Sequence, residues 1–322
     1  MRKRLCAFIV MLALLVVTAN IQPQVVLAKG EQGALSMTTK KSTLMAGKSF
    51  RYEVTYKKDK DKVVLSGKDV TWSVSDQKVA TVKKDGTLKA KTVGKVTLKA
   101  KYRGLSVEYK VKVKGKKVIG IDAGHQAKGN SSLEPIGPGA SKKKAKVASG
   151  TTGISSKVPE YKLTLEIAKM LEKELISRGY EVIMTRTKND VNISNKERAQ
   201  QMNKACDIGI RLHCDGAANT SVRGASVLYT STKNPYVDSK ISKKSKSLGE
   251  ALIEKYCKAT GIKNRGGYLR DDLTGCNWST IPNVVLEMGF MSNSKEDVWM
   301  QKASNQKKMV QGIADGIEAY YK

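Results

Sequence analysis

The chain has 322 residues and a formal net charge of +30, with 59 Lys and Arg against 29 Asp and Glu. So basic a chain often binds nucleic acid, but this one contains no recognisable nucleic-acid fold and opens with residues typical of an export signal. We therefore exclude nucleic acid as its partner. Its longest apolar run is also shorter than the ~20 residues of a membrane helix, so we expect no stable membrane span after processing.

Residues 1–28 have the parts of a secretory signal peptide. MRKR is a basic head, CAFIVMLALLVV is a short apolar core, and small residues precede a cleavage site after Ala28. Cys6 lies at the head of the apolar run, which argues against a lipoprotein anchor. Cleavage would remove three basic residues and no acids, lowering the formal charge to +27. We expect a secreted, extracellular protein that is still strongly basic.

Residues 33–115 form short runs with alternating polarity, punctuated by Gly, Asp and Lys. This pattern is typical of a small all-β sandwich. The segment VTWSVSDQKVATVKKDGTLKAKTVGKVTLKAKY resembles the bacterial immunoglobulin-like domains, which are commonly spacers or adhesion modules. No cluster of titratable residues with catalytic spacing occurs here. The strands are expected at 48–56, 69–75, 78–82, 86–91, 94–102 and 105–114.

After a short basic linker at 112–117, residues 117–322 alternate strand and helix patterns. Such alternation predicts an α/β domain with an open, mostly parallel sheet, helices on both faces and ligands at the carboxyl ends of the strands. Ser194 with Glu197 and Ser294 with Asp297 are expected helix caps. Strands are expected at 118–124, 180–186, 207–213, 225–230 and 283–290. Helices are expected at 160–178, about 195–205, 243–260 and 307–321.

The only two histidines of the chain occupy equivalent places in this pattern. His125 ends the apolar run VIGIDAGH, and His213 lies near the end of CDIGIRLHCD. Unrelated histidines would not be expected at the ends of two separate strands. A metal site built at the strand ends requires ligands at both of these positions. Zinc is therefore the first hypothesis.

Two glutamates lie where an isolated charge would be costly. Glu160 begins a helix and falls on its apolar stripe, and Glu287 lies in the strand-like run NVVLEMGF. A buried carboxylate needs a partner or a function. Two imidazoles and one carboxylate are a known catalytic zinc set, with a further carboxylate as general base. Asp122 and Asp215 flank the histidines, and each could either orient an imidazole or serve a structural role.

These residues match a known family. IDAGH, PEYKLTL, RLHCD and VLEMGFMSN resemble the zinc-dependent N-acetylmuramoyl-L-alanine amidases (amidase type 3), which hydrolyse peptidoglycan between the muramic acid lactyl group and the first alanine of the stem peptide. The resemblance covers roughly residues 117–322. It implies that His125, Glu160 and His213 bind Zn²⁺ and that Glu287 is the catalytic general base and acid.

One departure from the family is a long insert at 126–158, which looks like a substrate-side loop of one branch. The resemblance also implies association with the cell wall. Anionic wall polymers are then a natural partner for a lysine-rich surface, with a solvated surface that has no specific partner as the alternative.

Two other classes of function stay open from the residues alone. Cys214 beside His213 suggests a thiol-dependent wall peptidase, although neighbouring strand residues point to opposite faces and cannot form a Cys-His dyad. A non-catalytic protein that binds or adheres to the wall is the other alternative.

Overall fold

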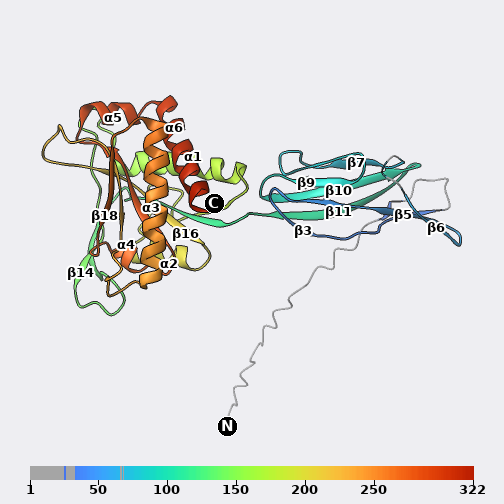
Figure 1. The fold of residues 1–322 in the computed structure, drawn as a ribbon, viewed down its shortest axis with the longest axis horizontal. Helices are drawn as coiled ribbons and strands as arrows, with labels where there is room; N and C mark the ends of the chain where they lie inside the picture. The colour runs from blue at the N-terminus through green and yellow to red at the C-terminus, as the bar shows by residue number, and fades with distance from the viewer. Residues whose placement is uncertain (1–24, 27–32, 66, 68) are drawn as a thin grey trace, which may run out of the picture.

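The computed structural model describes residues 25–26, 33–65, 67 and 69–322, which form two units joined by a short connection (Figure 1). The predicted signal peptide, 1–28, lies outside the described residues except for Val25–Val26. These two residues form strand β1, which pairs antiparallel with β11 (Leu105–Lys114). The signal peptide therefore stays a prediction.

The N-terminal unit is all β, as predicted. Its buried residues form a core separate from that of the C-terminal unit. β11 and β10 (Gly94–Tyr102) are the longest strands and pair along their whole length. β11 also pairs with β3 (Thr43–Met45), and β10 pairs with β7 (Thr71–Val74). The remaining strands are β2 (Ala34–Met37), β4 (Ser49–Arg51), β5 (Val54–Lys58), β6 (Asp61–Val64), β8 (Ala80–Val82) and β9 (Thr87–Ala90).

The C-terminal unit is built on a six-stranded sheet in the order β15-β12-β16-β19-β17-β18. The first four strands are parallel, while β17 runs antiparallel to β19 and parallel to β18. The prediction of an open, mostly parallel α/β sheet is thus confirmed. The strands are β12 (Val118–Ala123), β15 (Glu181–Met184), β16 (Ile208–Asp215), β17 (Ala225–Tyr229), β18 (Asn264–Leu269) and β19 (Asn283–Phe290).

Helices cover both faces of this sheet. On one face, α1 (Glu160–Ser177), α3 (Ser239–Thr260) and α6 (Ala303–Tyr320) pack together over the alternate apolar residues of the strands. The opposite face carries α2 (Asn195–Asn203), whose Met202 lies against Gly120 and Gly209 of two neighbouring strands. The four-residue helix α4 (Thr274–Asn277) contacts α2. The sheet itself therefore lies between the strand residues that point toward α2 and α4 and the main apolar core on the other face.

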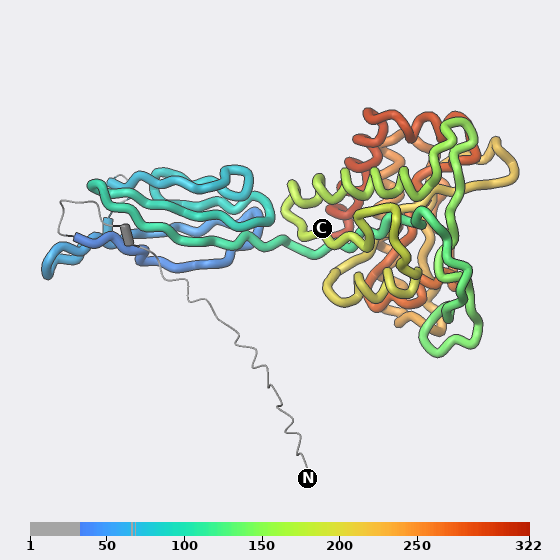
Figure 2. Tube along the Cα trace, turned by 180° about the vertical axis from the view of Figure 1, so that it is seen from behind, coloured from blue at the N-terminus to red at the C-terminus, as the bar shows by residue number. Residues whose placement is uncertain are grey.

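Several elements were not predicted. In the N-terminal unit these are β2, β3 and β6, and the strand expected at 48–56 is divided between β4 and β5. In the C-terminal unit they include β13, β14, β18 and α4. The insert at 126–158 forms a hairpin of β13 (Asn130–Pro135) and β14 (Lys143–Val147), which lies on the side of the C-terminal unit facing away from the β unit (Figures 1 and 2). Strand β18 contains two glycines and exposed side chains at its end, and it lacks a clear period of two. Helix α4 is too short to show helical periodicity.

The helix caps were predicted with mixed success. The capping box of Ser194 and Glu197 is present. The cap expected at Ser294 is wrong, because Asn293 caps α5 (Ser294–Met300) by accepting from two backbone amides of the first turn. The carboxylate of Asp297 instead accepts hydrogen bonds from the backbone amides of Ser155 and Ser156. Helices α3 and α6 also begin four residues earlier than predicted.

The connection between the units is shorter than the predicted linker, because β11 continues through Lys114. The amide of Gly115 donates to Glu181 Oε1 at 2.9 Å, and the amide of Lys116 donates to the carbonyl of Gly179 at 2.9 Å. These bonds tie the connection to the C-terminal unit. Within the described part of the chain, we find no helix with the length and apolarity of a membrane span.

Candidate metal centre

His125, Glu160 and His213 come from three separate elements and meet at the carboxyl end of the sheet. His213 is on β16, His125 follows β12, and Glu160 is the first residue of α1. His125 Nε2 lies 3.1 Å from Glu160 Oε2, and His213 Nδ1 lies 3.2 Å from Glu160 Oε1. The two imidazole nitrogens are 3.0 Å apart. The structure thus brings together the three residues that the sequence singled out as ligands.

The spacing of these atoms fits a tetrahedral metal ion. Zn–N and Zn–O bonds near 2.0–2.1 Å place neighbouring ligand atoms about 3.3 Å apart in a tetrahedron. The three separations in this cluster are close to that value, with each imidazole next to a different oxygen of Glu160. One ligand atom from each of the three residues lies within 4.8 Å of the other two. Two imidazoles and one carboxylate are also the donor types that zinc prefers. The residues present therefore fit a zinc ion with an open fourth position.

Hydrogen bonds from outside the cluster fix the direction of His125 and Glu160. His125 Nδ1 lies 2.8 Å from the carbonyl oxygen of Ala148. Since a carbonyl only accepts, Nδ1 must carry the proton, which leaves the Nε2 lone pair facing the cluster. The carboxylate of Glu160 accepts from the amides of Thr151 and Cys214, both at 2.9 Å. Two of these contacts come from the end of the insert, which therefore forms part of the site.

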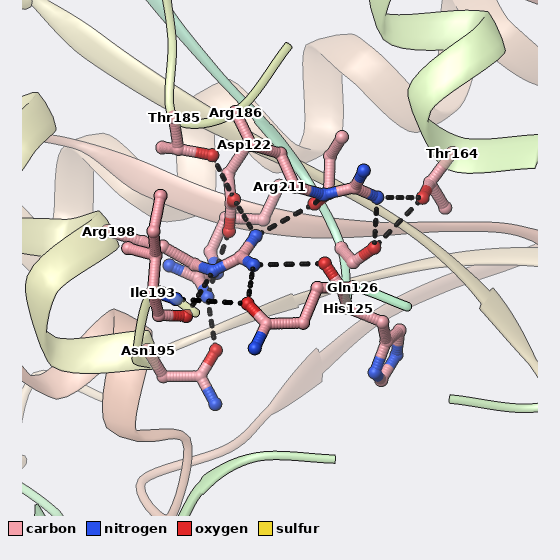
Figure 3. Close-up of polar contacts among 12 residues, drawn as sticks. Asp122, His125, Gln126, Thr164, Thr185, Arg186, Ile193, Asn195, Arg198 and Arg211 are labelled. Carbon is pink, nitrogen blue, oxygen red and sulfur yellow. Dashed lines mark hydrogen bonds and ion pairs between the residues drawn. The ribbon is translucent and has the colours of Figure 1, made fainter. Parts of the chain in front are cut away.

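A buried network of arginines holds the backbone that carries His125 (Figure 3). His125 has a left-handed φ of 60°, which is uncommon for a residue with a side chain. Arg198 donates to the carbonyl of His125 at 2.9 Å and to Asp122 Oδ1 at 2.8 Å. Arg186 donates to the carbonyls of Ala123 and Gly124. The surrounding bonds can thus hold a strained conformation at the candidate ligand.

Of the two roles left open for Asp122 and Asp215, the structure favours the structural one, because neither forms a hydrogen bond with an imidazole in the described part of the chain. Asp122 is fully buried and pairs with Arg198 and Arg211. Burial raises the pKa of this carboxyl, but the two guanidinium groups outweigh burial and hold the pKa well below its usual range. Asp215 accepts from the amide of Gly216. Asp122 therefore acts on His125 only through Arg198 and the backbone.

Burial and the neighbouring groups shift the pKa values of the three candidate ligands in opposite directions. Burial raises the pKa of Glu160, but the two neighbouring imidazoles lower it far below the usual value. Burial lowers the pKa of His125, but Glu160 raises it above its ordinary value. The pKa of His213 is lowered, first by burial and then by the neighbouring His125, despite the hydrogen bond with Glu160. An anionic Glu160 and at least one neutral imidazole suit a bound cation.

Glu287 lies beside the cluster without belonging to it. It is on β19, directly opposite His213 of β16 in the parallel register. Among the described residues, its Oε2 has no hydrogen-bond partner although the atom is buried. Burial raises the pKa of Glu287 well above its ordinary value, and the nearby Glu160 and Asp215 raise it further. A carboxyl poised in this way is a candidate for proton transfer.

The cluster and Glu287 open onto one pocket of ≈ 310 Å³. Apolar contacts come from Leu228, Leu273 and Val285, and two arginines, Arg211 and Arg270, add positive charge. We did not predict a role for either arginine. A signal for Arg211 was present, because it lies two residues before His213 and so must share its face of the strand. No comparable pattern marks Arg270, which reaches the pocket from the end of the unpredicted strand β18.

The cysteines do not form a competing site. Four of the described residues are cysteines, and all four are free thiols. Cys214 points away from His213 into the main apolar core, and its burial raises the pKa of its thiol well above the ordinary value. Burial likewise raises the pKa of Cys206, Cys257 and Cys276, in each case to about 11. These thiols lack the lowered pKa of a nucleophilic cysteine.

Comparison with known proteins gives the same division of the chain. Residues 119–319 match the profile of a family described as N-acetylmuramoyl-L-alanine amidase, and residues 35–102 match the bacterial Ig-like domain, group 2. The chain is 28% identical over 173 residues to the probable cell wall amidase LytH of Staphylococcus epidermidis, covering 52% of this chain and 54% of that one. The chain thus spans about half the length of the curated relatives it first matches.

Two mycobacterial proteins match over more of their length. N-acetylmuramoyl-L-alanine amidase Rv3717 of Mycobacterium tuberculosis is 28% identical over 210 residues, covering 63% of this chain and 86% of the relative. The apo crystal structure of the N-acetylmuramyl-L-alanine amidase Ami1 of Mycobacterium abscessus superposes with a TM-score of 0.59 at 25% identity. That comparison covers 65% of this chain and all of the crystallised one.

Proposed function

Because this chain belongs to the N-acetylmuramoyl-L-alanine amidase family, we propose that residues 117–322 hydrolyse peptidoglycan at the amide between N-acetylmuramic acid and the L-alanine of the stem peptide. The observation that carries the proposal is the strand register, which places Glu287 directly opposite His213 on the adjacent strand. It puts a carboxylate oxygen that has no hydrogen-bond partner among the described residues next to a cluster that fits zinc. A metal site with a proton-transfer group next to it is the equipment for amide hydrolysis.

In this proposal His125, Glu160 and His213 hold the Zn²⁺. The bound ion would polarise the amide carbonyl and lower the pKa of water toward ~7. Arg198 and Ala148 keep His125 in position, from its backbone and its ring respectively. Glu160 supplies the single negative charge of the ligand set.

Glu287 is proposed as the general base and then the general acid. As a new C–O bond forms at the amide carbon, the Glu287 carboxylate accepts a proton from the attacking water. As the C–N bond breaks, Glu287 passes that proton to the nitrogen of the departing alanine. Leu228, Leu273 and Val285 line the pocket and limit the access of bulk water to the carboxyl. A raised pKa favours the second step, because it makes Glu287 a ready proton donor at neutral pH.

The division of labour in the chain follows from this activity. We propose that residues 33–115 form an Ig-like unit that holds the enzyme on the cell wall, and that 117–322 form the catalytic domain. Peptidoglycan is the substrate, and anionic wall polymers are the proposed partner of the basic surface. Export through a signal peptide at 1–28 and action outside the cell stay predictions.

Metal analysis of the purified protein, together with mass spectrometry of fragments released from peptidoglycan, tests the proposal. The expected result is zinc in the protein, new alanine amino termini and intact glycan strands. Activity should disappear with a chelator and return with zinc. A thiol peptidase would instead lose activity to an alkylating agent and ignore the chelator. A binding protein would adsorb to sacculi and release nothing, and either outcome would refute the amidase.

A further inference from the structure

The outer face of the sheet β7-β10-β11-β3 carries a row of lysines on each of its two long strands. In β10, buried Val96, Leu98 and Ala100 alternate with outward residues, and β11 alternates in the same way. The outward lysines are Lys95, Lys99 and Lys101 of β10 and Lys110, Lys112 and Lys114 of β11. We call these six residues the lysine face.

Most charges on the lysine face are not compensated. Lys99 pairs with Glu108 at 2.8 Å. In the part of the chain that the structure describes, the other five lysines of the face form no ion pair. Lys95 lies directly opposite Lys112 in the antiparallel register. Like charges directly opposite each other destabilise a sheet, so folding alone does not favour this arrangement.

The lysine face presents positive charges at regular intervals along its two strands. Residues on one face of a strand repeat every ~6.6–6.8 Å, and neighbouring strands lie ~4.8 Å apart. Lys110, Lys112 and Lys114 therefore follow one another along β11. On β10, Lys95 lies opposite Lys112, while Lys99 and Lys101 continue the face opposite Glu108 and Ser106. All six residues are lysines, which act as point charges, and none is an arginine with its bidentate fork. Such a face suits regularly spaced anions on an extended polymer better than one shaped ligand.

We propose that the lysine face binds a linear, phosphodiester-linked polyanion of the cell wall. The proposal rests on the wall location that follows from the proposed function. Attraction of this kind is long-ranged and falls with salt. Among the described side chains, the outer faces of β3 and β7 add Thr, Ser and Met residues beside the lysines, such as Ser73 and Met45, and no acid.

The position of the lysine face relative to the catalytic domain supports this role. Strand β11 leads through three residues, Gly115 to Lys117, into β12, the strand that His125 follows (Figure 1). Hydrogen bonds from Gly115 and Lys116 to the catalytic domain fasten this connection. A polymer bound to β10 and β11 would therefore keep the catalytic domain close to the wall that bears it. A small soluble substrate would gain nothing from this contact.

The test compares two variants of the full chain that lose equal charge. The first changes Lys95, Lys101, Lys110 and Lys112 to Gln. The control changes four exposed lysines on and around β8 and β9 to Gln: Lys78, Lys83, Lys84 and Lys89. Binding is measured by sedimentation with isolated walls, before and after hydrofluoric acid removes the phosphodiester polymers, and with inorganic polyphosphate in solution.

The lysine-face variant should bind untreated walls and polyphosphate more weakly by on the order of tenfold or more, with a shallower dependence on salt. The control should stay within about twofold of wild type. Replacing the same four lysines by Arg should restore binding, which separates charge from misfolding. Equal losses in the lysine-face variant and the control would overturn the proposal. Wild-type binding that survives removal of the polymers would also overturn it.

Hydrolysis of a small soluble muropeptide, measured on the same proteins, keeps this proposal separate from the amidase. The lysine-face variant should retain wild-type turnover of that substrate. If wild type binds the polymer but never hydrolyses the muropeptide, the proposed enzyme activity fails while the polymer-binding face stands.

Discussion

Glu287 of β19 is the register partner of His213 on the neighbouring parallel strand β16. The imidazole of His213 belongs to the ligand cluster. The carboxylate of Glu287 has a buried oxygen without a hydrogen-bond partner among the described residues. The two proposed roles, metal binding by His213 and proton transfer by Glu287, thus belong to different residues on neighbouring strands. Substitutions can test them one at a time.

Glu287→Gln should keep zinc while hydrolysis falls by a factor on the order of 100 to 10,000, the usual range for a lost general acid or base. Gln has nearly the same shape but cannot accept the proton. Glu160→Gln and His213→Ala should lower zinc content and activity together, because each removes a ligand. Metal content and turnover are measured side by side. A fully active Glu287→Gln protein would exclude Glu287 from the mechanism, and a zinc-free one would make it a ligand.

The raised pKa of Glu287 predicts a pH-dependent stability difference in the metal-free protein. A carboxyl whose pKa is higher when folded holds its proton longer in the folded state, so stability falls as pH rises from ~4.3 through the raised value. Gln does not titrate. Glu287→Gln should therefore raise the Tm of the metal-free protein at pH 8 and change it little at pH 4. Thermal melts across this range check the sign, and a constant difference would contradict the raised pKa.

Asp122→Asn should lower the free energy of unfolding by about 3–5 kcal/mol, because it leaves Arg198 and Arg211 buried without their counter-charge. The pKa of Asp122 is lowered in the folded state, so this loss is complete above about pH 4 and shrinks as the pH falls further. Asp272→Asn is the control. Asp272 pairs with Arg270 and Lys144 at the surface, where such a change costs at most about 1 kcal/mol. Denaturant unfolding of both variants gives the comparison.

Gly150→Ala should reduce zinc affinity or activity by about 10- to 100-fold, the range for lost support of a metal ligand. Gly150 has φ +83°, and a Cβ there would lie 2.8 Å from Glu160 Oε2 and from His125 Cγ. Gly139→Ala is a matched control, because Gly139 has φ +74° and no atom within 4 Å of the added carbon. Both variants strain the backbone, but only the first crowds the ligands. Equal activity of the two would show that the insert does not position the site.

The sequence alone determined the residues from which the site is built. Strand patterns ended at His125 and His213, and carboxyl ends of parallel strands meet at one edge of a sheet, so the two imidazoles were expected together. Helical spacing placed Glu160 on the buried stripe of α1, where the structure has it. Alternating polarity also predicted β10 and β11 as strands of an all-β unit. These features depend on local periodicity, which a single chain displays directly.

Only the tertiary structure decided how those residues are held and paired. The register that puts Glu287 opposite His213 depends on strands far apart in the chain. The partners of Asp122 are guanidinium groups on α2 and β16, and the carbonyl that orients His125 comes from the insert. Such contacts leave no periodic signal, because they arise when distant segments pack and each buried polar group must find whichever partner lies within reach.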